Sequence, residues 1–224
     1  MIRQNALRRA QQISLVVALL ALAASGWLVY RRLHEQRSEQ AKLAAGLRVG
    51  LVAGHKGSDS GAVCPDGLTE AEVNLDIAER TADRLRRAGA AVDLLEEYDP
   101  RMRGYVADAF VSIHADSCES SLSGFKVARV EQSAVPQIED RLVDCLWQRY
   151  GETTGLAAHP GTITYDMRDY HAFREIDPQT PGAIIEVGFL GGDRRLLTSQ
   201  PELVAKGVAE GIFCFLSGPA AGDQ

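Results

Sequence analysis

Polar groups that can bind a metal ion or move a proton stand where short apolar runs of the sequence stop. His55 follows one run, His114 ends a second, and Glu186 interrupts a third. A single histidine in such a position is more often a hydrogen-bonded structural residue than a metal ligand. If the runs are parallel strands, however, their carboxyl ends meet at one edge of a sheet, where ligands bind. The convergence of all three groups therefore predicts a site.

A fourth candidate is a glutamate at the start of a predicted helix. Thr69, with Glu72 three residues later, fits a capping box, which gives Glu72 an ordinary structural role. Helical spacing puts Glu70 on the apolar face of this helix and Glu72 on its charged face. A carboxylate on a buried face is costly unless it is paired or bound to a metal ion. Glu70 is therefore the residue that requires a partner.

Two histidines and a glutamate form a typical ligand set for catalytic zinc. His55, Glu70 and His114 would hold Zn²⁺ and leave a fourth position for water. Zinc bound in this way lowers the pKa of the water towards about 7 and polarises a carbonyl group. Glu186 would then be a carboxylate that is not a ligand, and its apolar neighbours should raise its pKa, which suits proton transfer. The chemistry predicted is metal-assisted amide hydrolysis.

The elements that must position these residues follow an alternating pattern. Short apolar runs alternate with segments of helical periodicity, which predicts a single α/β domain with a mainly parallel sheet flanked by helices on both faces. Strands are predicted at 47–53, 91–95, 109–113, 124–130 and 182–189, and helices at 69–88, 135–150 and 201–216.

Four segments, taken together and in order, are similar to the motifs of one enzyme family. They read AGHKGSDSGA at 53–62, GLTEAEVNLDIA at 67–78, FVSIHAD at 110–116 and AIIEVGFL at 183–190. From about residue 47 to 216 the chain resembles the zinc-dependent N-acetylmuramoyl-L-alanine amidases, which are bacterial cell-wall hydrolases. The resemblance implies a twisted sheet flanked by helices, Zn²⁺ on His55, Glu70 and His114, and Glu186 as the catalytic glutamate. The implied substrate is peptidoglycan, cut between N-acetylmuramic acid and the L-alanine of the stem peptide.

The motifs also depart from the family pattern. Lys56 stands where a second glycine is usual, Asp116 where asparagine is common, and Gly191 and Gly192 where Ser-Asn is expected. The segment 95–108 is shorter than expected. None of these changes removes a predicted ligand, but they leave substrate fit and regulation open.

Other polar residues are weaker candidates for the site. Asp59 and Asp116 could orient a ligand histidine. His171 and Arg174 could line the cleft, although a loop surface is the simpler interpretation.

The N-terminal part of the chain predicts a membrane anchor. Residues 13–30 carry no charge and would form a helix of about 27 Å, close to the thickness of a bilayer. Residues 1–12 are a short basic segment, 31–46 a polar stalk, 47–217 the catalytic domain and 218–224 a tail. The alternative is a cleavable signal peptide with a small-residue site at 21–23. Arginines lie on both sides of the run, so the distribution of positive charge does not predict its orientation. Because the predicted chemistry acts on the cell wall, the domain is expected to be extracytoplasmic, on the bacterial cell membrane.

Composition narrows the possible partners. The net charge of −6 argues against nucleic acid, because surfaces that bind nucleic acid are usually basic. Four cysteines show no CxxC pair, so no thiolate zinc site is indicated. In an exported domain Cys64 and Cys118 could form a disulfide near the site, whereas Cys145 and Cys214 are expected in the core. The expected partners are peptidoglycan and the membrane, and any protein regulator is unknown.

Two other functions compete with the amidase. A non-catalytic, membrane-anchored peptidoglycan-binding or regulatory module would be expected to have lost a ligand or the catalytic glutamate, and all four residues remain. A zinc carboxypeptidase would require an arginine for a terminal carboxylate, for which Arg174 is the obvious candidate.

Overall fold

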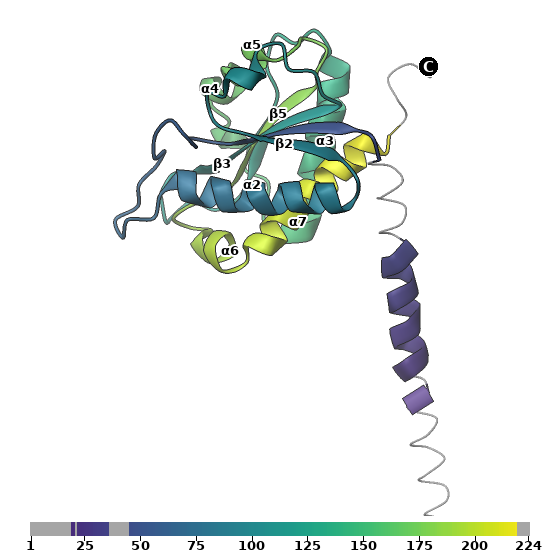
Figure 1. Ribbon diagram of the computed structural model, residues 1–224. Helices are drawn as coiled ribbons and strands as arrows, with labels where there is room; N and C mark the ends of the chain where they lie inside the picture. The colour runs from purple at the N-terminus through teal and green to yellow at the C-terminus, as the bar shows by residue number, and fades with distance from the viewer. Residues whose placement is uncertain (1–18, 21, 36–44, 219–224) are drawn as a thin grey trace, which may run out of the picture. The chain divides into compact units, whose positions relative to one another are not determined.

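Five strands form one sheet in the order β2-β1-β3-β5-β4. In this computed structural model, which describes residues 19–20, 22–35 and 45–218, four of the strands are parallel and β4 is antiparallel at the edge (Figure 1). The predicted strand at 124–130 is shortened to three residues. The bounds are β1 (Arg48–Ala53), β2 (Ala91–Leu95), β3 (Ala109–Asp116), β4 (Lys126–Ala128) and β5 (Gly182–Phe189).

Long helices cover one face of the sheet, and short helices cover the other. In Figure 1, α2 and α7 lie below the strands while α4 and α5 lie above them. The expectation of helices on both faces is therefore only partly right, because the second cover consists of segments of three or four residues joined by loops. The long helices are α2 (Glu70–Arg87), α3 (Pro136–Thr154) and α7 (Pro201–Leu216), with α6 (Arg194–Ser199) before α7; the short ones are η1 (Pro100–Met102), η2 (Pro160–Thr162), α4 (Tyr165–Arg168) and α5 (Ala172–Glu175).

Alternation along β3 decides which face carries His114. Val111 and Ile113 enter the larger core, beneath the long helices. Phe110 points to the opposite face and enters the smaller core, formed with the short helices. Because side chains alternate along a strand, Ser112 and His114 share the face of Phe110. His114 therefore lies at the carboxyl end of the sheet, on the side of the short helices.

Two disulfides tie the domain together. Cys64–Cys118 links the loop before α2 to the segment after β3, next to two of the family-like motifs, as the sequence allowed. Cys145–Cys214 links α3 to α7, a pairing that the sequence left open when it placed both residues in the core. Both residues face each other across the contact between these helices, where only the packing brings them together.

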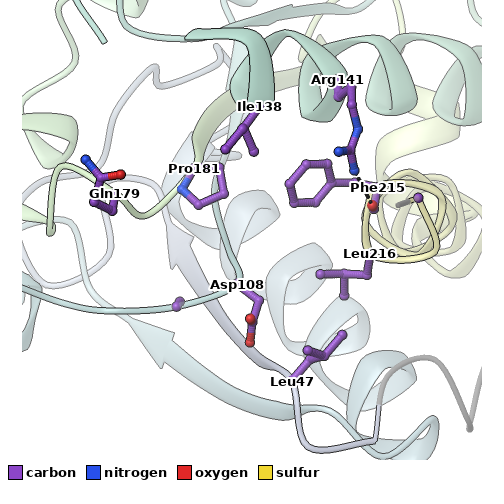
Figure 2. Close-up of a pocket in the computed structure, with 10 residues that line it drawn as sticks. Leu47, Asp108, Ile138, Arg141, Gln179, Pro181, Phe215 and Leu216 are labelled. Carbon is purple, nitrogen blue, oxygen red and sulfur yellow. Dashed lines mark hydrogen bonds between the residues drawn. The ribbon is translucent and has the colours of Figure 1, made fainter. Parts of the chain in front are cut away.

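A hollow of ≈ 290 Å³ opens at the amino end of the sheet (Figure 2). Leu47, Asp108 and Pro181, which directly precede β1, β3 and β5, line it together with side chains of α3 and α7. His55 follows β1 and His114 lies near the carboxyl end of β3, so this hollow lies at the opposite end of the sheet from the two histidines.

The N-terminal segment forms a unit of its own, residues 1–40. Its described residues, 19–20 and 22–35, are helical and present exposed apolar side chains such as Leu22, Trp27 and Leu28. Among the residues that the structure describes, no helix is both long and apolar enough to cross a membrane. The predicted anchor at 13–30 falls partly outside the described residues, which lack 13–18 and 21.

Candidate functional site

The structure brings His55, Glu70 and His114 together at the carboxyl end of the sheet. One ligand atom from each lies within 4.8 Å of the others. Oε1 of Glu70 is 3.3 Å from Nε2 of His55 and 3.1 Å from Nδ1 of His114. Ligand atoms bound to tetrahedral zinc at about 2.0 Å lie about 3.3 Å from one another. The donor set therefore fits a metal ion of this size with little rearrangement.

His55 reaches the site through an unusual backbone conformation. Its φ is 65°, and it is the one non-glycine residue with positive φ in the described ranges. Such a conformation is uncommon for a residue with a side chain and persists where the surroundings enforce it. Here the His55 N–H donates to Oε2 of Glu97 at 2.7 Å, which holds the turn after β1 in place.

Glu70 is fixed by the start of α2. Thr69 and Glu72 form the predicted capping box, so the structural role of Glu72 is confirmed. Glu70 is buried, and its carboxylate accepts hydrogen bonds from the Asn74 side chain at 3.1 Å and from the backbone N–H of Ala62 at 3.2 Å. Burial alone would raise its pKa, but hydrogen bonds to the two histidines outweigh this and hold the pKa well below its usual range.

The two histidines lie in an electronegative environment. The hydrogen bond to Glu70 is the main reason that the pKa of His55 is raised to about 9, and Asp59 adds to it with Oδ1 2.6 Å from Nδ1. Burial disfavours the charged form of His114, yet Glu70, Glu186 and Glu97 raise its pKa. The site thus stabilises positive charge, which can be supplied by protons or by a metal ion.

Glu186 lies beside this cluster in the sheet. It is level with His114 of β3 and with Lys126 of β4, so the three side chains share one face. Its Oε2 atom is buried and has no hydrogen-bond partner among the described residues. Burial raises its pKa to about 7, in the direction that its apolar neighbours predicted. A carboxyl group of this kind can exchange a proton near neutral pH.

The weaker candidates divide into those near the site and those away from it. Asp59 contacts His55, one of the predicted ligands, whereas Asp116 pairs with the buried Lys126 at 2.5 Å instead. His171 reaches Glu97 at 2.8 Å, but Arg174 forms an exposed pair with Asp169.

Sequence reasoning missed Glu97, Tyr170 and Lys126. Glu97 accepts hydrogen bonds from Tyr170 and His171, and these bonds together with the charge of His114 lower its pKa, although burial opposes them. One signal was present, because Glu97 follows β2 as closely as His55 follows β1. Tyr170 lies between two very short helices and offers no comparable pattern.

Gly54 should be essential for the position of His114. A Cβ at Gly54 would lie 2.4–2.6 Å from three atoms of the His114 ring, which is too close for any side chain. We expect Gly54→Ala to displace the His114 ring. Zinc binding should then weaken ~10-fold or more, which is the usual effect of disturbing the groups that orient a metal ligand. Gly161→Ala is the control, because a Cβ there meets nothing within 4 Å. Equal zinc dissociation constants for the two variants would contradict the prediction.

Comparison with known proteins identifies the family. The sequence profile described as N-acetylmuramoyl-L-alanine amidase matches residues 49–214. The chain belongs to this family. The matched range contains His55, Glu70, His114 and Glu186, so all four residues lie within the amidase domain.

Similar proteins include sequence relatives and a solved structure of the same fold. An uncharacterized Bacillus subtilis protein, YqiI, is 38% identical over 96 residues, 39% of this chain and 46% of that protein. The amidase AmiC of Neisseria meningitidis is 40% identical over 79 residues, 31% of this chain and 19% of AmiC. The matched part thus spans less than half the length of these relatives. Among solved structures, the CwlD amidase of Clostridioides difficile, in complex with the GerS lipoprotein, has a TM-score of 0.63 at 23% identity and covers 77% of this chain and 99% of CwlD.

Proposed function

We propose that this chain is a zinc-dependent N-acetylmuramoyl-L-alanine amidase that removes stem peptides from peptidoglycan. The observation that carries the proposal is the cluster of His55, Glu70 and His114, whose ligand atoms lie within 4.8 Å of one another. Oε2 of Glu186, which has no hydrogen-bond partner among the described residues, belongs to the same sheet face as His114. Family membership supplies the bond that is cut, which is the amide between N-acetylmuramic acid and L-alanine.

Each residue has a distinct task in this proposal. Nε2 of His55, the carboxylate of Glu70 and Nδ1 of His114 would hold the ion. Zinc in such a site lowers the pKa of water and polarises a carbonyl oxygen. Glu186 would take a proton from the attacking water at Oε2 and deliver it to the nitrogen of the leaving L-alanine. Its raised pKa suits it to both halves of this transfer.

The test uses the full chain, purified in a mild detergent. We expect about one zinc per chain and release of peptides beginning with L-alanine from purified peptidoglycan. Removal of zinc by a chelator should stop the release, and added zinc should restore it. Zinc binding with an intact wall would instead indicate a non-catalytic peptidoglycan-binding module. Cleavage within the stem peptide would indicate a peptidase.

We also propose that the amidase domain lies outside the cytoplasm, anchored by residues 13–30. The uncharged run supports the anchor, and the pairs Cys64–Cys118 and Cys145–Cys214 support an oxidising compartment, where disulfides persist. Alkaline extraction of membranes should leave the chain in the pellet, and protease added to spheroplasts should degrade the domain. A chain released by alkali, or one protected from the protease, would contradict the proposal.

A further inference from the structure

We propose that Glu97 is a positioning residue for the metal centre, because its single carboxylate fixes both ligand histidines. The inference rests on the proposed metal site. Glu97 is 5% exposed and follows β2, which neighbours β1 in the sheet. The order β2-β1-β3 therefore places Glu97, His55 and His114 after or at the ends of three consecutive parallel strands.

The first link runs from Glu97 to the backbone of His55. Oε2 accepts the His55 N–H at 2.7 Å, and the Glu97 N–H donates to the carbonyl of Lys56 at 2.9 Å. These two hydrogen bonds join the loop after β2 to the turn after β1. Because His55 adopts a positive φ, loss of this support would let the turn relax and move the imidazole away from Glu70.

The second link runs from Glu97 to the ring of His114. Oε2 of Glu97 is 3.6 Å from Nε2, and the Tyr170 hydroxyl is 3.4 Å from the same nitrogen. An ionised carboxylate can only accept, so Tyr170 must give its one proton to Oε1 of Glu97. The Tyr170 oxygen then faces His114 as an acceptor, as it does for the Ser112 hydroxyl at 3.1 Å.

Both neighbours of His114 Nε2 are therefore acceptors, and Nδ1 faces a third acceptor, Oε1 of Glu70, at 3.1 Å. A metal ion between His114 and Glu70 would replace the proton on Nδ1, while the proton on Nε2 would keep its acceptors. The network thus favours the tautomer that binds a metal ion through Nδ1. Glu97 acts here both directly and through the orientation of the Tyr170 hydroxyl.

The contacts of Glu97 also distinguish this role from a catalytic one. His171 donates to Oε1 at 2.8 Å, beside Tyr170, and Oε2 serves His55 and His114. Three hydrogen bonds and the 3.6 Å contact with His114 therefore join this buried carboxylate to protein groups, as expected of a residue that positions others. His171 is itself stacked on Tyr98, with ring centroids 4.3 Å apart.

The experiment measures the zinc dissociation constant of the full chain by competition with a chelator. In Glu97→Gln an amide nitrogen, which cannot accept a hydrogen bond, replaces one carboxylate oxygen. We expect zinc affinity to fall ~10–100-fold as a result. Tyr170→Phe should weaken binding less, and the losses in the double variant should not add, because both groups act on the same nitrogen. The Co²⁺-loaded absorption spectrum should change in the same variants, as the histidine donors are reoriented.

Glu139→Gln is the matched control, since Glu139 is also a buried glutamate but accepts from the N–H of Gly182 at the far end of β5. The inference is overturned if Glu97→Gln binds zinc as the wild type does, or loses no more affinity than Glu139→Gln. If Glu97→Gln does not fold, Tyr170→Phe carries the same test, and wild-type affinity in that variant overturns the inference. A wild-type chain that binds no zinc would refute the proposed function itself.

Discussion

Glu186→Gln is expected to reduce amide hydrolysis ~10²–10⁴-fold, the usual contribution of a general acid or base, while zinc content stays at the wild-type level. The substitution keeps the size of the side chain and removes its capacity to accept and return a proton. Oε2 of Glu186 is buried without a partner among the described residues, and burial raises the pKa of the group to about 7. No predicted ligand is changed, so the metal site should remain intact.

The measurement is peptide release from purified peptidoglycan, with zinc content determined on the same sample. Glu139→Gln again provides the control, because burial also raises the pKa of Glu139, which lies on α3 and accepts from the N–H of Gly182 at the amino end of β5. This control should retain wild-type activity. Full activity in Glu186→Gln would remove Glu186 from the mechanism, whereas loss of both zinc and activity would make it a part of the metal site.

Glu70→Gln should abolish zinc binding at concentrations that saturate the wild type, and with it all peptide release. Glu70 supplies the one carboxylate of the cluster, and its Oε1 lies within 3.3 Å of a ring nitrogen of each histidine. Loss of a direct ligand should exceed the ~10–100-fold effect of losing an outer partner. Zinc affinity measured by chelator competition tests this directly.

Glu72→Gln is the paired control from the same turn of α2. Glu72 is exposed and completes the capping box, a role that glutamine can also fill, so stability should change by less than ~0.5 kcal/mol. We expect wild-type zinc affinity and activity from this variant. If the two substitutions had the same effect on zinc, the assignment of Glu70 as a ligand would be wrong.

Much of the site was predictable from the sequence because it depends on local periodicity. A helix places every third or fourth residue on one face, and this alone separated the buried Glu70 from the capping residue Glu72. Parallel strands bring their carboxyl ends to one edge, and this brought His55 and His114 together before any contact was known. The bounds of β2, β5 and α7 agree with the predicted ranges for the same reason.

Contacts between loops could not be predicted in this way. The network of Glu97, Tyr170 and His171 joins a loop after β2 to a segment more than 70 residues later, and neither part has a repeating pattern. The pairing of Asp116 with Lys126 depends on the antiparallel placement of β4 beside β5, which the run at 124–130 did not specify.

The sequence by itself therefore determined the amidase motifs, the main elements and the four candidate site residues. Only the tertiary structure decided which groups surround the two predicted ligand histidines, how unequally the two faces of the sheet are covered, and that Cys145 pairs with Cys214. The physical reason is that periodicity reports the environment of one element at a time. The partners of a side chain across loops and layers depend on strand order and packing, which are properties of the whole fold.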